Sequence, residues 1–275
     1  MFMKPNFIFI GPDKSGSSWL YNIFKAHPEI FVPEIKDIYF FDRYYDRGID
    51  WYFSFFEAAP KECKAVGELS HDYLFSAEAA KRIRKDLPDV KIFTVLRNPV
   101  EKIWSHYLFL IRSGITKKPF EIAINEIPEL IEKSLYYPNL KVYYDLFEPH
   151  QIGVFLFDDL KKDSRKFAKD IFDFLGVSYI DNLPYEEKVL PASKPRSFLV
   201  AKIVKTGANI FRQIGLETVV GKVKSNKTVQ KLLYKPYKKK PKMSEETKQK
   251  LKEIFRNDIE KTSKLVNLDL SMWYR

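Results

Sequence analysis

Residues 6–25 read NFIFIGPDKSGSSWLYNIFK, and this stretch predicts the fold of the chain. The apolar run FIFI at residues 7–10 is typical of a strand buried on both faces of a parallel sheet. The run stops at Gly11, and apolar residues with helical spacing begin near Ser17. A strand, a glycine-containing turn and a helix start direct backbone N–H groups and the helix dipole toward a phosphate. The stretch therefore predicts an anion-binding loop with Lys14 as its mobile charge. The expected hydrogen-bond donors of this loop are Ser15, Gly16, Ser17 and Ser18.

The loop differs from the ATP-binding P-loop, which requires the pattern Gly-x4-Gly-Lys-Ser/Thr. Gly11 and Gly16 have the required spacing, but Ser17 stands at the lysine position and the lysine lies three residues earlier, at Lys14. A short Lys-Ser-Gly-Ser-Ser turn after a first strand resembles instead the 5′-phosphosulfate loop of sulfotransferases, which use 3′-phosphoadenosine 5′-phosphosulfate (PAPS). Taken alone, the loop is also compatible with an ordinary Gly/Ser turn that exposes a lysine.

Composition and charge narrow the class of protein. The chain has 275 residues, and 45% of them are hydrophobic, which is ample for one large α/β core. No apolar run approaches the ~20 residues of a membrane-spanning helix, and the first strand begins by Phe7, which leaves no room for a signal peptide. The single cysteine, Cys63, excludes an internal disulfide framework and a cysteine-rich metal site. We therefore expect a soluble, cytoplasmic protein, and the net charge of +11 predicts an anionic partner.

A second candidate segment lies at residues 36–41 and reads Lys-Asp-Ile-Tyr-Phe-Phe. Charged groups beside aromatic residues are typical of a cleft in which pKa values are tuned. The segment resembles the Lys-Glu-x-x-Phe-Phe segment of sulfotransferases, whose carboxylate is the base for the acceptor hydroxyl. The resemblance assigns this role to Asp37, which is one methylene shorter than glutamate. Without the resemblance, an amphipathic surface segment explains the pattern equally well.

Residues 65–68, Ala-Val-Gly-Glu, predict a second short strand, and Leu69-Ser70-His71 follows it. In sulfotransferases this place is often Gly-Glu-Lys-Ser/Thr-Pro, and its lysine reaches into the active site. Here Leu69 and His71 replace that lysine and proline. His71 is therefore a candidate acid/base or acceptor-binding group, and a structural hydrogen-bonding histidine is the alternative.

The clearest central strand is KIFTVL at residues 91–96, which ends at Arg97-Asn98-Pro99. Asn98 and Pro99 predict a helix start. An arginine at the carboxyl end of a parallel strand lies where open α/β sheets bind ligands, and its guanidinium fork suits a phosphate dianion. Arg97 and Ser105 resemble the 3′-phosphate motif of sulfotransferases, Arg-x-Pro-x5-Ser, with the same spacing. A helix-capping salt bridge is the alternative role of Arg97.

The strands and helices expected along the chain predict a single α/β domain over residues 1–275. Another buried strand is expected at residues 152–157. Helices are expected near residues 77–86, 99–113, 120–133, 140–147 and 164–175, and after Ser244. The resemblance implies the same fold class, which is a central parallel sheet flanked by helices and related to the P-loop nucleotide kinases.

Basic residues are frequent in the later part of the chain. The loop with Lys194, Arg196 and Ser197 resembles the basic loop that folds over the 3′-phosphate in sulfotransferases, and a solvated linker is the alternative. Residues 198–242 form a predicted basic helical excursion within the domain, with apolar residues at helical spacing. Such a stretch attracts an acidic acceptor or makes peripheral contact with a membrane surface. A solvated helical excursion is the alternative.

Together the motifs resemble PAPS-dependent sulfotransferases of bacterial type, and in particular glycan and heparan sulfate sulfotransferases, over nearly the whole chain. The implied reaction transfers a sulfuryl group from PAPS to an acceptor hydroxyl or amine, without a metal, and leaves adenosine 3′,5′-bisphosphate (PAP). Lys14 is expected to neutralise the leaving phosphate oxygen, and Asp37 or His71 to take the acceptor proton. Arg97 and Ser105 are expected to hold the 3′-phosphate. The expected acceptor is a saccharide, particularly an acidic glycan.

Two other classes of function stay open at the level of the sequence. A P-loop kinase or NTPase would need magnesium and ATP, but the chain lacks a lysine at the motif position and a convincing carboxylate for the metal. A non-enzymatic basic protein would bind nucleic acid with a steep salt dependence. We favour the sulfotransferase and expect no nucleic acid partner.

Overall fold

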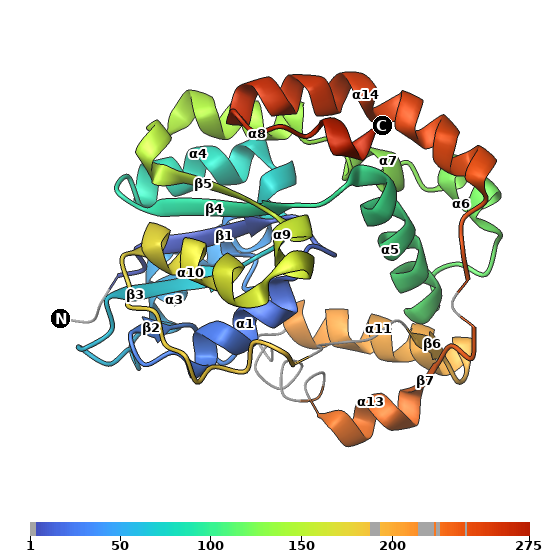
Figure 1. Ribbon diagram of the computed structural model, residues 1–275. Helices are drawn as coiled ribbons and strands as arrows, with labels where there is room; N and C mark the ends of the chain where they lie inside the picture. The colour runs from blue at the N-terminus through green and yellow to red at the C-terminus, as the bar shows by residue number, and fades with distance from the viewer. Residues whose placement is uncertain (1–3, 188–192, 214–222, 224–225, 240) are drawn as a thin grey trace. The chain divides into compact units, whose positions relative to one another are not determined.

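Five parallel strands form the central sheet of the computed structural model, in the order β2-β3-β1-β4-β5 (Figure 1). The structure describes residues 4–187, 193–213, 223, 226–239 and 241–275. The bounds of the strands are Phe7–Gly11 for β1, Ile30–Phe31 for β2, Ala65–Leu69 for β3, Lys91–Leu96 for β4 and Ile152–Leu156 for β5. The sheet confirms the predicted α/β fold with a central parallel sheet.

Two compact units are distinguished by their internal contacts. The sheet unit comprises Met1–Asn98, Tyr136–Val189 and Lys261–Leu268 and contains the central sheet. The helical unit comprises Pro99–Leu135, Leu190–Glu260 and Asp269–Arg275. Each unit is built from segments that are far apart in the sequence.

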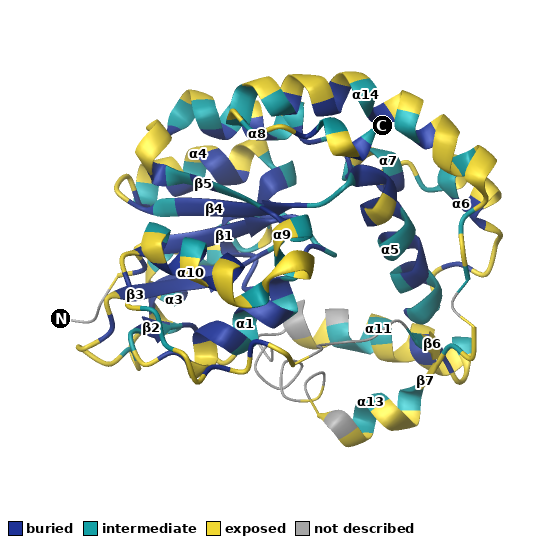
Figure 2. Ribbon diagram, in the orientation of Figure 1, coloured by how far each residue is buried: buried dark blue, intermediate teal, exposed yellow. Residues whose placement is uncertain are grey.

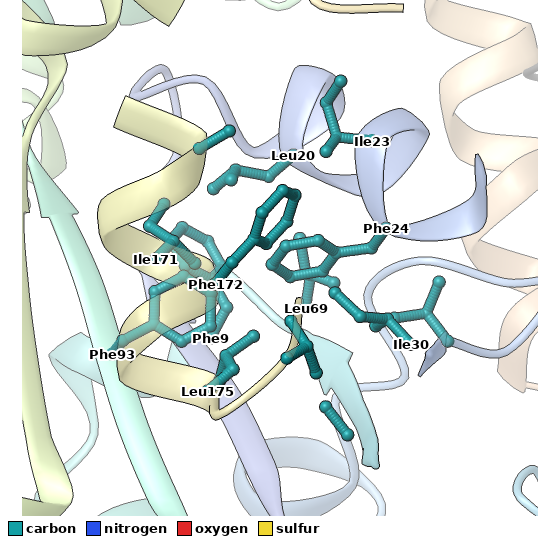
Figure 3. Close-up of a cluster of buried hydrophobic side chains, with 14 of the residues drawn as sticks. Phe9, Leu20, Ile23, Phe24, Ile30, Leu69, Phe93, Ile171, Phe172 and Leu175 are labelled. Atoms are coloured by element: carbon teal, nitrogen blue, oxygen red, sulfur yellow. The ribbon is translucent and has the colours of Figure 1, made fainter. Parts of the chain in front are cut away.

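The strand β1 is buried along its whole length because both faces of the sheet are covered, as the apolar run predicts. Phe7 and Phe9 belong to a buried cluster with Phe93 of β4. Figure 3 shows side chains of the helices α1 and α10 packed onto this cluster. Ile8 and Ile10 are also buried, and their alternation along the strand directs them to the opposite face.

Two helices of the sheet unit, α4 and α10, begin and end where the sequence predicts, whereas α8 begins three residues earlier than predicted and α9 is not predicted. Ser76 caps α4 by accepting a hydrogen bond from the backbone N–H of Ala79, and Gly176 ends α10 in the left-handed conformation. The bounds are Ser17–Ala26 for α1, Phe40–Arg43 for α2, Ile49–Ser54 for α3, Ala77–Asp86 for α4, Tyr137–Leu146 for α8, Phe157–Lys162 for α9 and Ser164–Leu175 for α10.

The helical unit differs from the sequence prediction at residues 120–133. A single helix is predicted there, but the structure has two short helices, because Pro128 cannot continue the hydrogen-bonding pattern of the first. The helices of this unit are α5 (Pro99–Arg112), α6 (Phe120–Glu126), α7 (Glu129–Glu132), α11 (Phe198–Gln213), α13 (Lys227–Leu233) and most of α14 (Glu245–Val266). The strands β6 (Ser193–Pro195) and β7 (Tyr234–Pro236) pair antiparallel, and the sequence does not predict this pair.

The predicted excursion at residues 198–242 contains α11, α13 and β7. Residues 214–222, 224–225 and 240 of this stretch lie outside the described residues. The assignment of these residues to one excursion stays a prediction.

Candidate active site

Three neighbouring strands of the sheet unit end at one edge, and the candidate site is built there. Phe9 of β1 pairs with Leu69 of β3 on one side and with Phe93 of β4 on the other. Because the strands are parallel, the segments that follow them meet at the same edge of the sheet. The backbone N–H of Asp37 adds a fourth segment, since it donates to the carbonyl of Leu69 at 3.0 Å.

The segment after β1 forms the predicted anion-binding loop at the start of α1. Gly16 is the N-cap of α1 with φ 89°, and the first turn of the helix has no acidic residue. A glycine N-cap has no side chain that could accept from the backbone N–H groups of this turn. These N–H groups and the helix dipole favour an anion at this point. Lys14 is half-buried and also has a positive φ of 62°. A Cβ atom at Gly11 would lie 2.2 Å from the carbonyl oxygen of His71, so only glycine allows the loop this close to the segment after β3.

The segment after β4 brings Arg97 to this loop. The Nη1 atom of Arg97 donates to the backbone carbonyl of Lys14 at 2.8 Å, and the guanidinium lies 4.6 Å from the ring centroid of Phe157. The hydroxyl of Tyr136 donates to the carbonyl of Arg97 at 2.7 Å and so holds the end of the strand. The two residues that the sequence places in separate anion-binding motifs thus lie in direct contact.

Asp37 and His71 form a hydrogen-bonded pair at the same edge. Nδ1 of His71 lies 2.6 Å from Oδ1 of Asp37, and Nε2 lies 3.2 Å from the hydroxyl of Tyr39. A neutral imidazole with its proton on Nδ1 satisfies both contacts, because it donates to Asp37 and accepts from Tyr39. The side chains of Asp37 and His71 are 15% and 22% exposed, so solvent and a substrate can reach them.

Lys36 connects the anion-binding loop to this pair. Its Nζ atom donates to the hydroxyl of Ser17 at 2.9 Å and lies 3.8 Å from Oδ1 of Asp37. Lys36 was not predicted as a site residue. The signal that could have found it is its position beside Asp37 in the Lys-x-x-x-Phe-Phe pattern.

A buried carboxyl group supports the segment that carries Asp37. Glu68 is 1% exposed and accepts hydrogen bonds from Ser70 at 2.5 Å and from Tyr73 at 3.0 Å. Ser70 in turn accepts from the backbone N–H of Tyr39 at 3.2 Å. Asp37 and Tyr39 both have positive φ values, 67° and 58°, which non-glycine residues rarely adopt. The network of Glu68 and Ser70 therefore holds a strained turn in place.

Burial raises the pKa of the Glu68 carboxyl to about 7, and hydrogen bonds from Ser70 and Tyr73 offset part of this effect. Burial also raises the pKa of the nearby Asp42 carboxyl to about 6. Both carboxyl groups bind protons more tightly in the folded protein than in the unfolded chain. The free energy of unfolding must therefore fall as the pH rises through the interval between the unfolded and folded pKa values.

We predict that Glu68→Gln removes about half of this pH dependence, because the pKa of the Asp42 carboxyl is raised by a similar amount. Between pH 4.5, the ordinary pKa of glutamate, and the folded value of about 7, the native protein should lose about 3 kcal/mol of stability from this group. Urea unfolding of both proteins at a series of pH values measures the difference, because Asp42 titrates in both. Glu57→Gln is the exposed control. An equal pH slope in Glu68→Gln and the native protein would show that Glu68 does not titrate as stated.

The other predicted nucleotide-binding residues belong to the helical unit. Ser105 is half-buried on α5. Lys194 lies on β6, and Arg196 donates from Nε to the carbonyl of Lys231 at 3.1 Å. Ser197 accepts a hydrogen bond from the first turn of α11. The roles of these four residues toward a nucleotide stay predictions.

Membrane-spanning helices and clusters of metal-ligating side chains are both absent from the described part of the chain. None of its helices combines the length and the apolar character that crossing a bilayer requires. Within the same residues, His, Cys, Asp and Glu side chains do not gather in groups of three or more that could hold a metal ion. The expectation of a reaction without a metal stays a prediction.

Comparison with known proteins agrees with this geometry. Residues 4–265 match the family model described as "Sulfotransferase domain". The chain is 28% identical over 195 residues to bifunctional heparan sulfate N-deacetylase/N-sulfotransferase 3 of Homo sapiens, which covers 63% of the chain and 22% of that protein. It is 35% identical over 136 residues to the membrane-associated sulfotransferase kil1 of Dictyostelium discoideum, which covers 46% of the chain and 29% of that protein. The chain thus spans less than a third of the length of these relatives.

A solved structure extends the agreement in fold to the whole chain. The crystal structure of a sulfotransferase from Alicyclobacillus acidocaldarius superposes with a TM-score of 0.73 and covers 99% of this chain and 100% of that one, at 24% identity. At this identity the match shows the fold alone. The family model, by contrast, covers nearly all of the sequence, from residue 4 to residue 265. The chain therefore belongs to the sulfotransferase domain family.

Proposed function

We propose that the protein transfers a sulfuryl group from PAPS to a hydroxyl or amine group of a saccharide. The observation that carries the proposal is the hydrogen bond from Arg97 to the backbone of Lys14, which joins two anion-binding segments in one site. PAPS has anionic groups at both ends of one nucleotide, at the 5′-phosphosulfate and at the 3′-phosphate. ATP has no 3′-phosphate, so it gives Arg97 no such partner.

In the proposed reaction the bond from sulfur to the 5′-phosphate oxygen breaks as the bond from sulfur to the acceptor oxygen or nitrogen forms. Negative charge develops on the leaving phosphate oxygen. Lys14 and the backbone N–H groups at the start of α1 stabilise this charge. The sulfuryl group carries less negative charge than a γ-phosphoryl group, so the transfer has less need of a metal.

The proton of the acceptor goes to the Asp37–His71 pair. Nε2 of His71 lies 3.2 Å from the Tyr39 hydroxyl, and in the proposed reaction the acceptor hydroxyl takes the place of this partner. Asp37 holds Nδ1 and stabilises the imidazolium that forms when Nε2 takes the proton. The imidazole also extends the reach of the site, since Asp37 is one methylene shorter than the glutamate of the family pattern.

A saccharide is the acceptor class that the relatives favour, because several of them are named as heparan sulfate sulfotransferases. The experiment is transfer of radiolabelled sulfate from PAPS to a panel of glycans, lipids and phenols. We expect label in the glycans. Label in phenols or lipids alone would overturn the acceptor class but keep the reaction. No transfer from PAPS, together with magnesium-dependent binding of ATP, would overturn the reaction itself.

We predict that Arg97→Ala weakens binding of PAP by about 10- to 100-fold, because a charged hydrogen-bonding partner of the 3′-phosphate is lost. Adenosine 5′-phosphate lacks the 3′-phosphate, so its affinity should change little. Isothermal titration calorimetry with both nucleotides measures the difference, and Arg84→Ala is the exposed control. An equal loss for both nucleotides would mean that Arg97 acts through the loop at Lys14 rather than on the 3′-phosphate.

A further inference from the structure

The positive charge of the protein is concentrated in one stretch. Residues 198–242 contain 12 lysine or arginine residues and one acidic residue, Glu217, which gives a net charge of +11. The totals for the chain are 47 basic and 36 acidic residues, so 35 of each sign lie in the rest of the chain. The whole net charge of the protein therefore resides in this stretch.

The helix α11 opens this stretch and exposes an apolar surface. Six of its large apolar side chains are exposed, in two adjacent rows with the helical spacings i, i+4 and i+11. One row is Leu199, Ile203 and Ile210, and the other is Val200, Val204 and Phe211. Leu199 is 69% exposed and Ile203 is 61% exposed, so their side chains are accessible to solvent. The yellow segments of α11 in Figure 2 mark its exposed residues.

Other side chains of α11 contact its own unit. Ala201 is buried, and Gly114 at the end of α5 allows a close approach to the backbone of Phe198 and Lys202. The ammonium group of Lys205 lies 5.6 Å from the ring centroid of Phe109 on α5. The helix thus packs against α5 with small and basic residues and leaves its large apolar residues outside, which is the reverse of the usual arrangement.

From this arrangement we infer that α11 and the basic residues after it bind the surface of an anionic phospholipid bilayer. The apolar rows insert at the level of the headgroups, and the lysines contact the anionic lipids. Exposed lysines are available for this contact at positions 231, 235, 238, 239 and 242. An acidic glycan would match the charge but would leave the six apolar side chains without a function. The helix lies on the membrane rather than across it, because its 16 residues are fewer than the ~20 that a membrane-spanning helix needs.

The test is co-sedimentation of the full chain with vesicles of phosphatidylcholine alone or mixed with phosphatidylserine, without nucleotide or acceptor. We expect binding to the mixed vesicles and at least about tenfold weaker binding to the neutral ones. High salt should weaken the binding. Equal binding to both vesicle types, or to neither, overturns the inference. Because the test uses neither nucleotide nor acceptor, its outcome does not depend on the proposed sulfuryl transfer.

Two sets of variants separate the contributions of the apolar side chains and of the charge. Leu199→Ser with Ile203→Ser should weaken binding to the mixed vesicles by about tenfold or more. The matched control is Ile115→Ser with Ile254→Ser, since these side chains are 51% and 54% exposed in the same unit.

The charge is tested by a triple variant, which should weaken binding to the mixed vesicles by about a hundredfold. It combines Lys235→Gln, Lys238→Gln and Lys239→Gln. Their control is the exposed set Lys61→Gln, Lys81→Gln and Lys85→Gln.

Two competing partners give different results in the same experiment. If an acidic glycan is the partner, the lysine variant loses retention on heparin and the serine variant keeps full vesicle binding. If a second copy of the chain covers the apolar rows, the serine variant changes the sedimentation coefficient of the free protein and leaves vesicle binding unchanged. Either result overturns the membrane inference.

Discussion

Replacing Lys14 with alanine is expected to lower kcat by about 10²- to 10³-fold, because the charge on the leaving phosphate oxygen loses its nearest mobile cation. Lys14 lies in the loop between β1 and α1, beside the backbone N–H groups of the first helical turn, whose N-cap is Gly16. These groups stay in the variant and continue to bind the 5′-phosphate. We therefore expect a small change in the Kd of PAP beside the large change in kcat.

Steady-state kinetics with radiolabelled PAPS measures this effect. Lys25→Ala is the control, since Lys25 is exposed in the last turn of the same helix. The control should keep the native kcat. If Lys14→Ala also kept the native kcat, the leaving group would be stabilised elsewhere. Lys36 would then be the next candidate, because its Nζ atom lies 2.9 Å from the hydroxyl of Ser17.

The second large effect is expected at the Asp37–His71 pair. Asp37→Asn should lower kcat by about 10²- to 10⁴-fold, because it disables the pair that takes the acceptor proton, while the affinity for PAP stays unchanged. His71→Gln should have an effect of similar size, since in the proposed reaction Nε2 receives the proton and Asp37 holds the ring. Asp50→Asn, at an exposed position, is the control.

A double variant tests whether the two residues act as one unit. Asp37→Asn with His71→Gln should be no slower than the more damaged single variant, because the pair is already inactivated when either member is lost. If the decreases in kcat of the two single variants multiplied in the double variant, Asp37 and His71 would have independent roles. Native activity in His71→Gln would leave Asp37 as the direct base and contradict the role of the imidazole.

The sequence predicts the parts of the fold that depend on local pattern. FIFI and KIFTVL are read correctly because strands covered on both faces are continuous apolar runs. Ser76 and Gly176 mark helix ends by capping chemistry that acts within a few residues. The family pattern also finds Lys14, Asp37 and Arg97, which the structure places at one edge of the sheet.

What the sequence does not predict depends on contacts between distant segments. The strands β6 and β7 are short and contain prolines, and they pair across about forty residues of sequence. The contact of Lys36 with Ser17 and the pairing of Asp37 with His71 follow from turns with positive φ that no local residue type requires. The raised pKa of Glu68 follows from its burial, which no single motif reveals. A cytoplasmic location stays a prediction.

A crystal structure with bound PAP tests the central claim most directly. We expect one molecule of PAP to be bound in the sheet unit. Its 5′-phosphate should accept hydrogen bonds from the N–H groups of residues 15–18 and contact Lys14, and its 3′-phosphate should contact the guanidinium of Arg97. A nucleotide that binds at another surface, or that contacts only one of these two side chains, would contradict the account.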